Sequence, residues 1–232
     1  MDRAFIFDVF GTLVDWRTGV AQACASSFKQ KGIEIDPYQF ATEWRAQYQP
    51  SMERIRSGNR GYVPLDILHR ENLDVVLEHH DLHHAFSNEE KDSLNTGWER
   101  LPAWPDVVAG LTKLKQHAFI APCSNGSIAM MMRIARHNNI HWDCILGAEI
   151  AKTYKPEPEV YLAACKALGL APSQVMMVAA HNNDLEAARQ AQLQTGFIAR
   201  SNEHGPAQTS DLEASSNWNF TGKNIISFDE II

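Results

Sequence analysis

Short apolar runs alternate along the chain with longer segments in which apolar residues recur every three or four positions. Five runs have the length of a buried strand and end in polar or turn-forming residues, which predicts strands at residues 4–9, 118–123, 144–148, 175–180 and 195–199. Helical spacing is found at residues 106–116, 128–138, 159–168 and 184–191. Strands and helices that alternate in this way are typical of a parallel sheet with right-handed crossovers.

Residues 15–98 interrupt this alternation because they are almost entirely helix-like. Helices are predicted at residues 20–31, 37–52, 64–80 and 88–98. We therefore predict an α/β fold with a doubly wound parallel sheet formed by residues 1–14 and 99–232, and a helical domain of residues 15–98 inserted after the first strand. Residues 202–222 are polar and rich in turn formers, and we expect them to wrap around the surface.

Composition narrows the functional classes. The 232-residue chain has a net charge of −7 and no basic run, which argues against a nucleic-acid partner. No apolar run is long enough to cross a membrane, and the N-terminus lacks signal-peptide character. The 4 cysteines have no CxxC spacing, which favours buried thiols over disulfides or a zinc site. We expect a cytoplasmic protein without a membrane or nucleic-acid partner.

Polar residues follow four of the predicted strands. Asp8 ends the first, Ser124 follows the second, Lys155 lies in the loop region after the third, and His181 and Asp184 follow the fourth. The carboxyl ends of parallel strands form the ligand crevice of such a sheet. Loops are polar in any case, but four loops that converge with these groups indicate a site. Asp8 taken alone is either a nucleophile or an acceptor for neighbouring backbone.

Four motifs in order resemble those of the haloacid dehalogenase superfamily. They are DVFGT around Asp8, SNG at residues 124–126, YKPEPEVY at residues 154–161, and HNNDLEAAR at residues 181–189. The resemblance covers nearly the whole chain and implies a Rossmann-like core with a helical cap after the first strand. Most members of this superfamily are phosphatases.

Two departures from the phosphatase pattern affect what the resemblance implies. Phosphatases place a second aspartate at the position of Phe10, where it protonates a leaving alkoxide, and another at the position of Ala180, where it helps to hold Mg²⁺. Asp8 and Asp184 are the obvious carboxylates that remain. The resemblance therefore implies neither a metal nor another cofactor. A halide leaves without a proton, so a carbon–halogen bond suits this site better than a phosphate ester.

Arg45 in the predicted cap resembles the arginine with which type II 2-haloacid dehalogenases hold the departing halide, and Phe10 resembles an aromatic residue of their pocket. The resemblance implies that Asp8 displaces the halide from a small 2-haloacid and forms an aspartyl ester that water cleaves. Enzymes of this type are often homodimers, which stays open here. The alternatives are a phosphatase-like hydrolase with another small substrate, and a catalytically silent binding protein.

The resemblance also implies roles for the residues around Asp8. Lys155 would keep Asp8 ionised, or else be a solvated loop lysine. Thr12 would donate a hydrogen bond to the Asp8 carboxylate, or only cap a turn. Ser124 and Asn125 would bind the substrate carboxylate, or cap the following helix.

Three further residues have implied roles near the hydrolytic water. Asp184 would activate or orient this water and pair with Lys155, or else cap a helix. Tyr161 would join the same network, or belong to the core. His181 stands where the best-known 2-haloacid dehalogenases carry asparagine, so it could act as a base on the water, donate to the halide or reduce the pocket.

Overall fold

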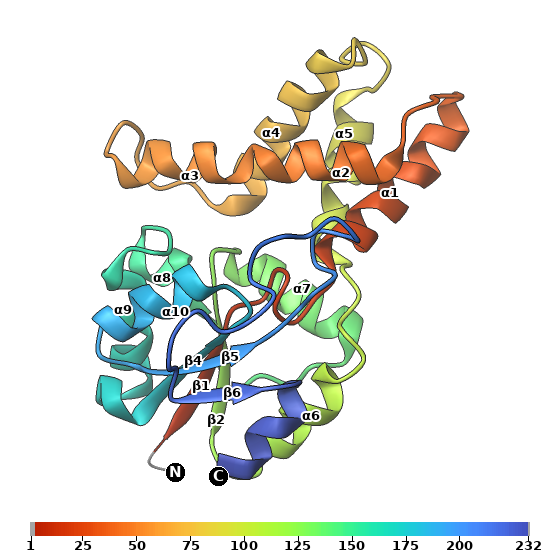
Figure 1. Ribbon diagram of the computed structural model, residues 1–232. Coiled ribbons are helices and arrows are strands. Elements are labelled where there is room, and N and C mark those ends of the chain that lie inside the picture. Colours follow the sequence, from red (N-terminus) through yellow and green to blue (C-terminus); the bar gives the residue numbers. More distant parts are fainter. Residues whose placement is uncertain (1–2, 232) are drawn as a thin grey trace.

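The computed structural model describes residues 3–231 and contains a six-stranded sheet whose paired strands all run parallel (Figure 1). The strand order is β3-β2-β1-β4-β5-β6, so the chain leaves the central strand β1 in both directions. Ligands bind where the strand order reverses in this way, at the carboxyl ends of the strands. The strands are β1 (Ala4–Phe7), β2 (Phe119–Ser124), β3 (Leu146–Gly147), β4 (Val175–Ala179), β5 (Gln194–Ile198) and β6 (Phe220–Gly222).

Both faces of the sheet are buried, as the continuous apolar character of β1 requires. Phe5 and Phe7 belong to one apolar cluster and Ala4 and Ile6 to another, because successive side chains point to opposite faces. The first cluster includes residues of α6 (Val107–Leu114), α7 (Ile128–Asn138) and η3 (Ile225–Ile231), and the second includes residues of α9 (Pro158–Leu168) and α10 (Asn182–Gln190). The short helix α8 (Ala148–Ala151) and the turn η2 (Pro172–Gln174) are the remaining elements around the sheet. The predicted doubly wound α/β fold is confirmed.

A layer of helices lies between β1 and β2 in the sequence and above the sheet in Figure 1. It contains α1 (Trp16–Lys31), α2 (Pro37–Ala46), α3 (Tyr48–Arg56), α4 (Leu65–His79), α5 (Asn88–Asn95) and the turn η1 (Thr96–Glu99). We refer to this layer as the cap. The exact division into residues 1–14 and 99–232 and residues 15–98 stays a prediction. Within residues 3–231, no helix has the length and hydropathy needed to span a bilayer.

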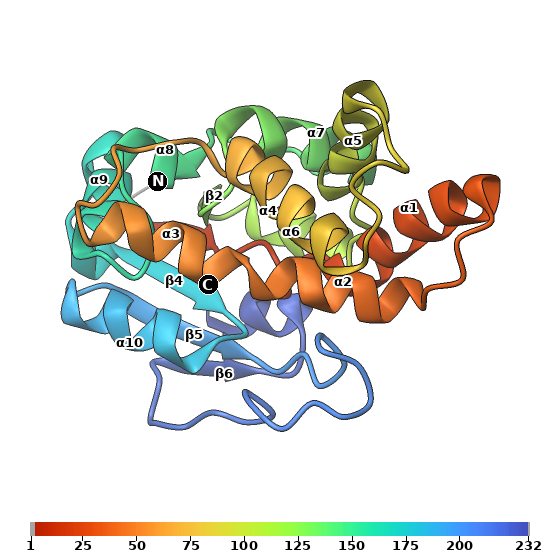
Figure 2. The ribbon, with the colours of Figure 1, turned by 90° about the horizontal axis from the view of Figure 1, so that it is seen from above.

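The helix predicted at residues 37–52 is instead two helices that meet at Gln47, and Figure 2 shows α2 and α3 nearly in line above the sheet. Pro50 explains the break. Inside one continuous helix its ring would clash with the carbonyl of Ala46, and no N–H could bond to that carbonyl. In the first turn of α3 no such N–H is needed, so Pro50 is tolerated there.

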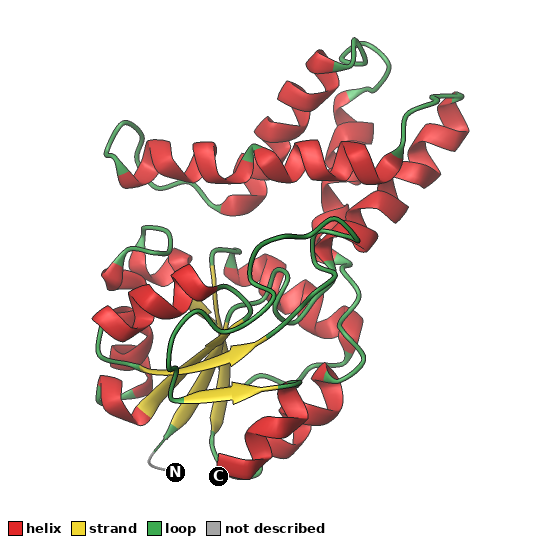
Figure 3. Cartoon of the chain, viewed as in Figure 1, coloured by secondary structure: helices red, strands yellow, loops and turns green. Residues whose placement is uncertain are grey.

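Residues 202–222 do more than wrap around the surface, so that expectation was wrong in part. The segment after β5 extends toward the cap (Figure 3), ends in β6, and buries the side chain of Glu203. The side chain of Asn182 anchors the part of this segment that precedes β6. Its amide nitrogen donates to Asp211 (2.8 Å), and its amide oxygen accepts from the Ser215 backbone and the Trp218 indole. A polar sequence without an apolar run gave no sign of this strand or of the buried carboxylate.

Candidate active site

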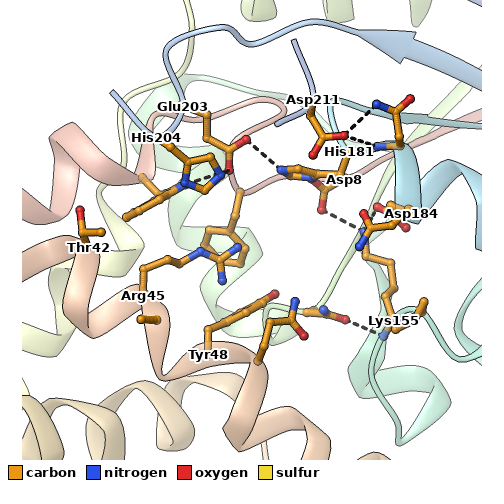
Figure 4. Close-up of a pocket in the computed structure, with 18 residues that line it drawn as sticks. Asp8, Thr42, Arg45, Tyr48, Lys155, His181, Asp184, Glu203, His204 and Asp211 are labelled. Carbon is orange, nitrogen blue, oxygen red and sulfur yellow. Dashed lines mark hydrogen bonds and ion pairs between the residues drawn. The ribbon is translucent and has the colours of Figure 1, made fainter. Parts of the chain in front are cut away.

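A cavity of about 630 Å³ lies between the cap and the carboxyl ends of β1 and β4 (Figure 4). The cap contributes α2, α3 and the first residue of α1 to its wall. The core contributes the loops after β1, β2 and β4, the loop that carries Lys155, and the segment after β5. Ten of the lining residues are central here: Asp8, Phe10, Trp16, Arg45, Tyr48, Asn125, Lys155, His181, Asp184 and Glu203. The fold therefore brings most of the predicted site residues to one cavity.

Asp8 follows β1 directly, and its carboxylate has a partner on each oxygen. Thr12 donates its hydroxyl to Oδ2 at 2.6 Å, and Lys155 Nζ lies 2.9 Å from Oδ1. Thr12 also accepts a hydrogen bond from the Ala180 backbone, which joins the loop after β1 to the end of β4. Burial raises the pKa of Asp8, but the Lys155 charge and the bonds from His181 and Thr12 hold that pKa well below its usual range. The carboxylate is ionised at neutral pH.

Lys155 bridges two carboxylates. Its Nζ lies 2.5 Å from Asp184 Oδ2, and the other Asp184 oxygen accepts the Tyr161 hydroxyl at 2.5 Å. Burial lowers the pKa of Lys155, but the charges of Asp184 and Asp8 raise it above its usual value overall. Lys155 is therefore a buried cation. Asp184 lies in the first turn of α10, where His181 holds the N-cap position, so a capping role for Asp184 is excluded.

The SNG loop separates into two kinds of residue. The Asn125 side chain lines the cavity and its oxygen accepts from the Lys155 backbone at 2.8 Å. Ser124 is fully buried, accepts from the Gly126 backbone, and does not line the cavity. The N-cap of α7 is Ser127. The substrate-binding role of Ser124 and Asn125 stays a prediction, and the cavity favours Asn125.

Arg45 reaches the cavity from the end of α2. Its guanidinium lies over the Tyr48 ring, 3.6 Å from the centroid, and 5.5 Å from the ring centroid of Trp16. Its Nε is buried and has no hydrogen-bond partner among the described residues. Phe10 is buried in the same region and meets Trp98 edge to face. The arrangement places a guanidinium cation in the wall of the cavity.

His181 lies between two carboxylates. Its Nδ1 is 3.2 Å from Asp8 Oδ2, and its Nε2 is 2.8 Å from Glu203 Oε2. Burial lowers the pKa of His181, but the charges of Glu203 and Asp8 and the bonds to them raise it well above its usual value. The imidazole is therefore protonated while Asp8 is a free carboxylate.

Glu203 is a site residue that the sequence analysis missed. It is 2% exposed, and its other oxygen accepts the Trp16 indole N–H at 3.0 Å. Gly11 makes room for it: a Cβ there would lie 2.1 Å from Glu203 Oε1, and Gly11 has φ of 83°. Glu203 follows the predicted strand 195–199 by four residues, so the strand-end rule could have pointed to it, but its polar SNEHG stretch was assigned to a surface segment.

The donor set does not fit a Mg²⁺ ion of the phosphatase kind. The Lys155 ammonium occupies the space between the Asp8 and Asp184 carboxylates, and Ala180 offers no side-chain ligand. Within residues 3–231, no group of three or more His, Cys, Asp or Glu side chains is arranged to hold a metal. Mg²⁺ requires several oxygen ligands in octahedral geometry.

The model of the haloacid dehalogenase-like hydrolase family matches residues 3–192, which is most of the chain. The chain belongs to this family of hydrolases. It is 31% identical over 211 residues to (S)-2-haloacid dehalogenase 1 of Pseudomonas sp. (strain CBS-3), covering 87% of this chain and 86% of that one.

Two solved structures are similar over nearly the full length. The defluorinating L-2-haloacid dehalogenase Rha0230 superposes with a TM-score of 0.97 at 46% identity, covering 99% of this chain and 94% of that one. The L-2-haloacid dehalogenase PA0810 superposes with a TM-score of 0.95 at 39% identity, covering 100% and 98%.

Proposed function

We propose that the protein hydrolyses short (S)-2-haloalkanoic acids to 2-hydroxy acids and halide, through an ester on Asp8 and without a metal ion. The observation that carries the proposal is an ionised, cavity-facing aspartate that shares the cavity with Arg45, whose buried Nε has no partner among the described residues. The names of the relatives supply the carbon–halogen bond and the stereochemistry.

In the first half-reaction, an Asp8 oxygen attacks the carbon that bears the halogen, and the carbon–halogen bond breaks with inversion. The leaving group departs as a halide and takes both bonding electrons, so no acid is needed at the position of Phe10. The Arg45 guanidinium stabilises the negative charge that develops on the halogen. The product is a neutral ester on Asp8.

In the second half-reaction, water attacks the ester carbonyl. Both Asp184 oxygens already accept bonds from Lys155 and Tyr161, which favours a structural role for Asp184. His181 is better suited to be the base because Nδ1 faces Asp8. Esterification removes the Asp8 charge, so the pKa of His181 falls and the ring can lose its proton.

The neutral imidazole then takes a proton from the attacking water and passes it to the alkoxide of the 2-hydroxy acid. The second water proton passes from the Asp8 carboxyl group to His181 Nδ1, which restores both the carboxylate and the imidazolium. The one proton that leaves in each turnover is therefore the proton that His181 gives up to solvent after esterification. Glu203 holds the ring through Nε2 and stabilises the imidazolium that forms during proton transfer.

Halide release tests the proposal. Purified protein with a chelator would be incubated with chloroacetate, fluoroacetate and both 2-chloropropionate enantiomers, beside an aryl phosphate with Mg²⁺. We expect chelator-resistant halide release, a preference for the (S) enantiomer, and a mass increase on the Asp8 peptide during turnover. Phosphate release that depends on Mg²⁺, without halide release, would contradict the proposal. Folded protein that forms no Asp8 adduct would instead favour a silent binding protein.

A further inference from the structure

A chain of three contacts joins the cap to the nucleophile. Trp16, the first residue of α1, donates its indole N–H to Glu203 Oε1 at 3.0 Å. Glu203 Oε2 lies 2.8 Å from His181 Nε2, and His181 Nδ1 lies 3.2 Å from Asp8 Oδ2. The indole therefore acts on the far end of the carboxylate that holds the imidazole.

The Trp16 ring is fixed from several sides, so the direction of its N–H is fixed too. It stacks on Trp98 with the ring planes 17° apart, and His204 meets it edge to face at 5.6 Å. The side chain is 1% exposed. A donor held this rigidly selects one orientation of the Glu203 carboxylate at little entropic cost.

Glu203 has few other partners in its buried position. Its backbone neighbour His204 has Nε2 3.6 Å from Oε1, beyond normal hydrogen-bond distance, and Gly11 packs against the carboxylate. Burial raises the pKa of Glu203, and the His181 and His204 charges and the bond from Trp16 lower it overall. The indole N–H is therefore the hydrogen-bond donor that satisfies Oε1, and this contact keeps Oε2 directed toward His181.

We propose that Trp16 is a positioning residue for the second half-reaction: its indole N–H keeps Glu203 ionised and aligned, so that His181 is basic enough to activate water. The ester cleavage in this inference rests on the proposed function, whereas the coupling of Trp16 to His181 through Glu203 does not. It assigns the first residue of the cap to the cleavage of the ester and not to its formation.

Loss of the indole N–H has two physical outcomes, and both act in the same direction. Glu203 either turns toward His204 or takes up a proton, and each weakens the negative charge that faces His181. The other charged groups around this site are Asp8, Arg45 from the cap, and Asp211 from the segment after β5. These groups are unchanged, so the pKa of His181 falls.

The test compares Trp16→Phe with Trp98→Phe. Each variant keeps an aromatic ring and loses one indole N–H, but the Trp98 N–H is buried without a partner among the described residues. We expect Trp16→Phe to retain the first-turnover halide burst within about 3-fold and to slow decay of the Asp8 ester about 10-fold. The acid limb of the decay rate should move to lower pH by about 1 unit. Trp98→Phe should leave that limb in place.

A merely structural role for Trp16 would slow both half-reactions together and leave the acid limb unmoved, which would overturn the proposal. So would an equal shift in Trp98→Phe, because phenylalanine keeps an aromatic ring against Trp16 and leaves the Trp16 indole N–H in place. A double-mutant cycle with Glu203→Gln guards against general misfolding: once the carboxylate is gone, Trp16→Phe should have no further effect on the limb. An additive effect in that background would contradict the inference.

A second readout does not depend on turnover. The imidazole resonance of His181, identified by its absence in His181→Asn, can be titrated by NMR in the free protein. We expect a lower midpoint in Trp16→Phe than in the wild type and Trp98→Phe. An unchanged midpoint would overturn the coupling whatever the substrate, whereas the expected shift in a protein that releases no halide would leave the coupling intact and refute only the proposed function.

Discussion

The cavity has two walls that differ in how their polar atoms are satisfied. The lysine wall comprises Asp8, Lys155 and Asp184, with the buried Tyr161 behind them, and each charged oxygen or nitrogen in it has a protein partner within 2.9 Å. The cap wall comprises Arg45, Tyr48 and Trp16, and there the Arg45 Nε has no partner among the described residues. Buried polar groups are normally paired.

The difference indicates when each wall acquires its partners. The lysine wall is complete in the protein alone, so Asp8, the proposed nucleophile, is ionised and oriented before a substrate arrives. The cap wall holds the Arg45 cation, whose Nε has no partner among the described residues, so we expect a ligand to supply the opposite charge. The predictions below test this contrast, from the largest expected effect to the smallest.

Asp8→Asn removes the nucleophile and should have the largest effect. We expect turnover to fall at least about 10⁴-fold, with no covalent adduct, because the amide is a poor nucleophile. Halide release and intact-protein mass measure this, with deamidation monitored. Asp15→Asn is the matched control because Asp15 only caps α1, where asparagine caps as well. Near wild-type turnover without deamidation would rule out Asp8 as the nucleophile.

Lys155→Met tests the lysine wall as a structural unit. It leaves the Asp8 and Asp184 carboxylates buried, close together and without their shared cation. We expect the free energy of unfolding to fall by about 3–5 kcal/mol in urea titrations at neutral pH. Lys166→Met, on the exposed side of α9, should cost less than about 0.5 kcal/mol. A loss as small as in this control would mean that the wall is not held by its charges.

Arg45→Lys tests the cap wall. Lysine keeps the charge but loses the planar guanidinium that lies over Tyr48. We expect the halide burst to slow about 10²-fold with little change in stability, because the arginine meets its partner only in the reaction. Rapid-quench halide assays measure the burst, and Arg54→Lys, whose guanidinium bonds Ser51, is the control. If unfolding free energy fell while the burst stayed unchanged, the contrast between the walls would fail.

His181→Asn tests the pH dependence of stability. The pKa of His181 is raised in the folded protein, so its contribution is fully present below the unfolded value of about 6.5 and is lost as pH rises through the folded value. Between pH 6.5 and 8.5 we expect the wild type to lose up to about 1.4 kcal/mol per pH unit relative to the variant. Urea titrations across this range measure the difference. His137→Asn, exposed on α7, should follow the wild type.

The three charged residues of the lysine wall could be predicted from the sequence because each lies at the end of a predicted strand or in the region that follows one, whereas Tyr161 was assigned only through the family resemblance. Asp8, Lys155 and Asp184 meet for this reason alone, since parallel strands end at one edge. Arg45 was found only through the family resemblance. The contact between Arg45 and Tyr48 depends on the break at Gln47, which Pro50 explains once the structure is known.

The contact between Glu203 and Trp16 could not be predicted, for a different physical reason. It joins residues 187 positions apart, and neither residue lies in a periodic pattern that indicates its partner. The fold of the segment after β5 depends on the amide of Asn182, and single side-chain bonds of this kind leave no trace in hydropathy. Such long-range contacts can be identified only from the structure.

Two bonds between the cap and the Lys155 loop affect how ligands enter and leave. Arg56 Nη1 from α3 donates to the Lys155 carbonyl at 3.0 Å, and the Tyr154 hydroxyl donates to the Val63 carbonyl at 2.5 Å. Both residues of the core loop are thus attached to the α3–α4 end of the cap. Any movement that lifts this end must break these bonds or pull on the loop that carries the cation of the lysine wall. The α1 end has no such attachment to that loop among the described residues and is held instead to the segment after β5, through the bond from Trp16 to Glu203.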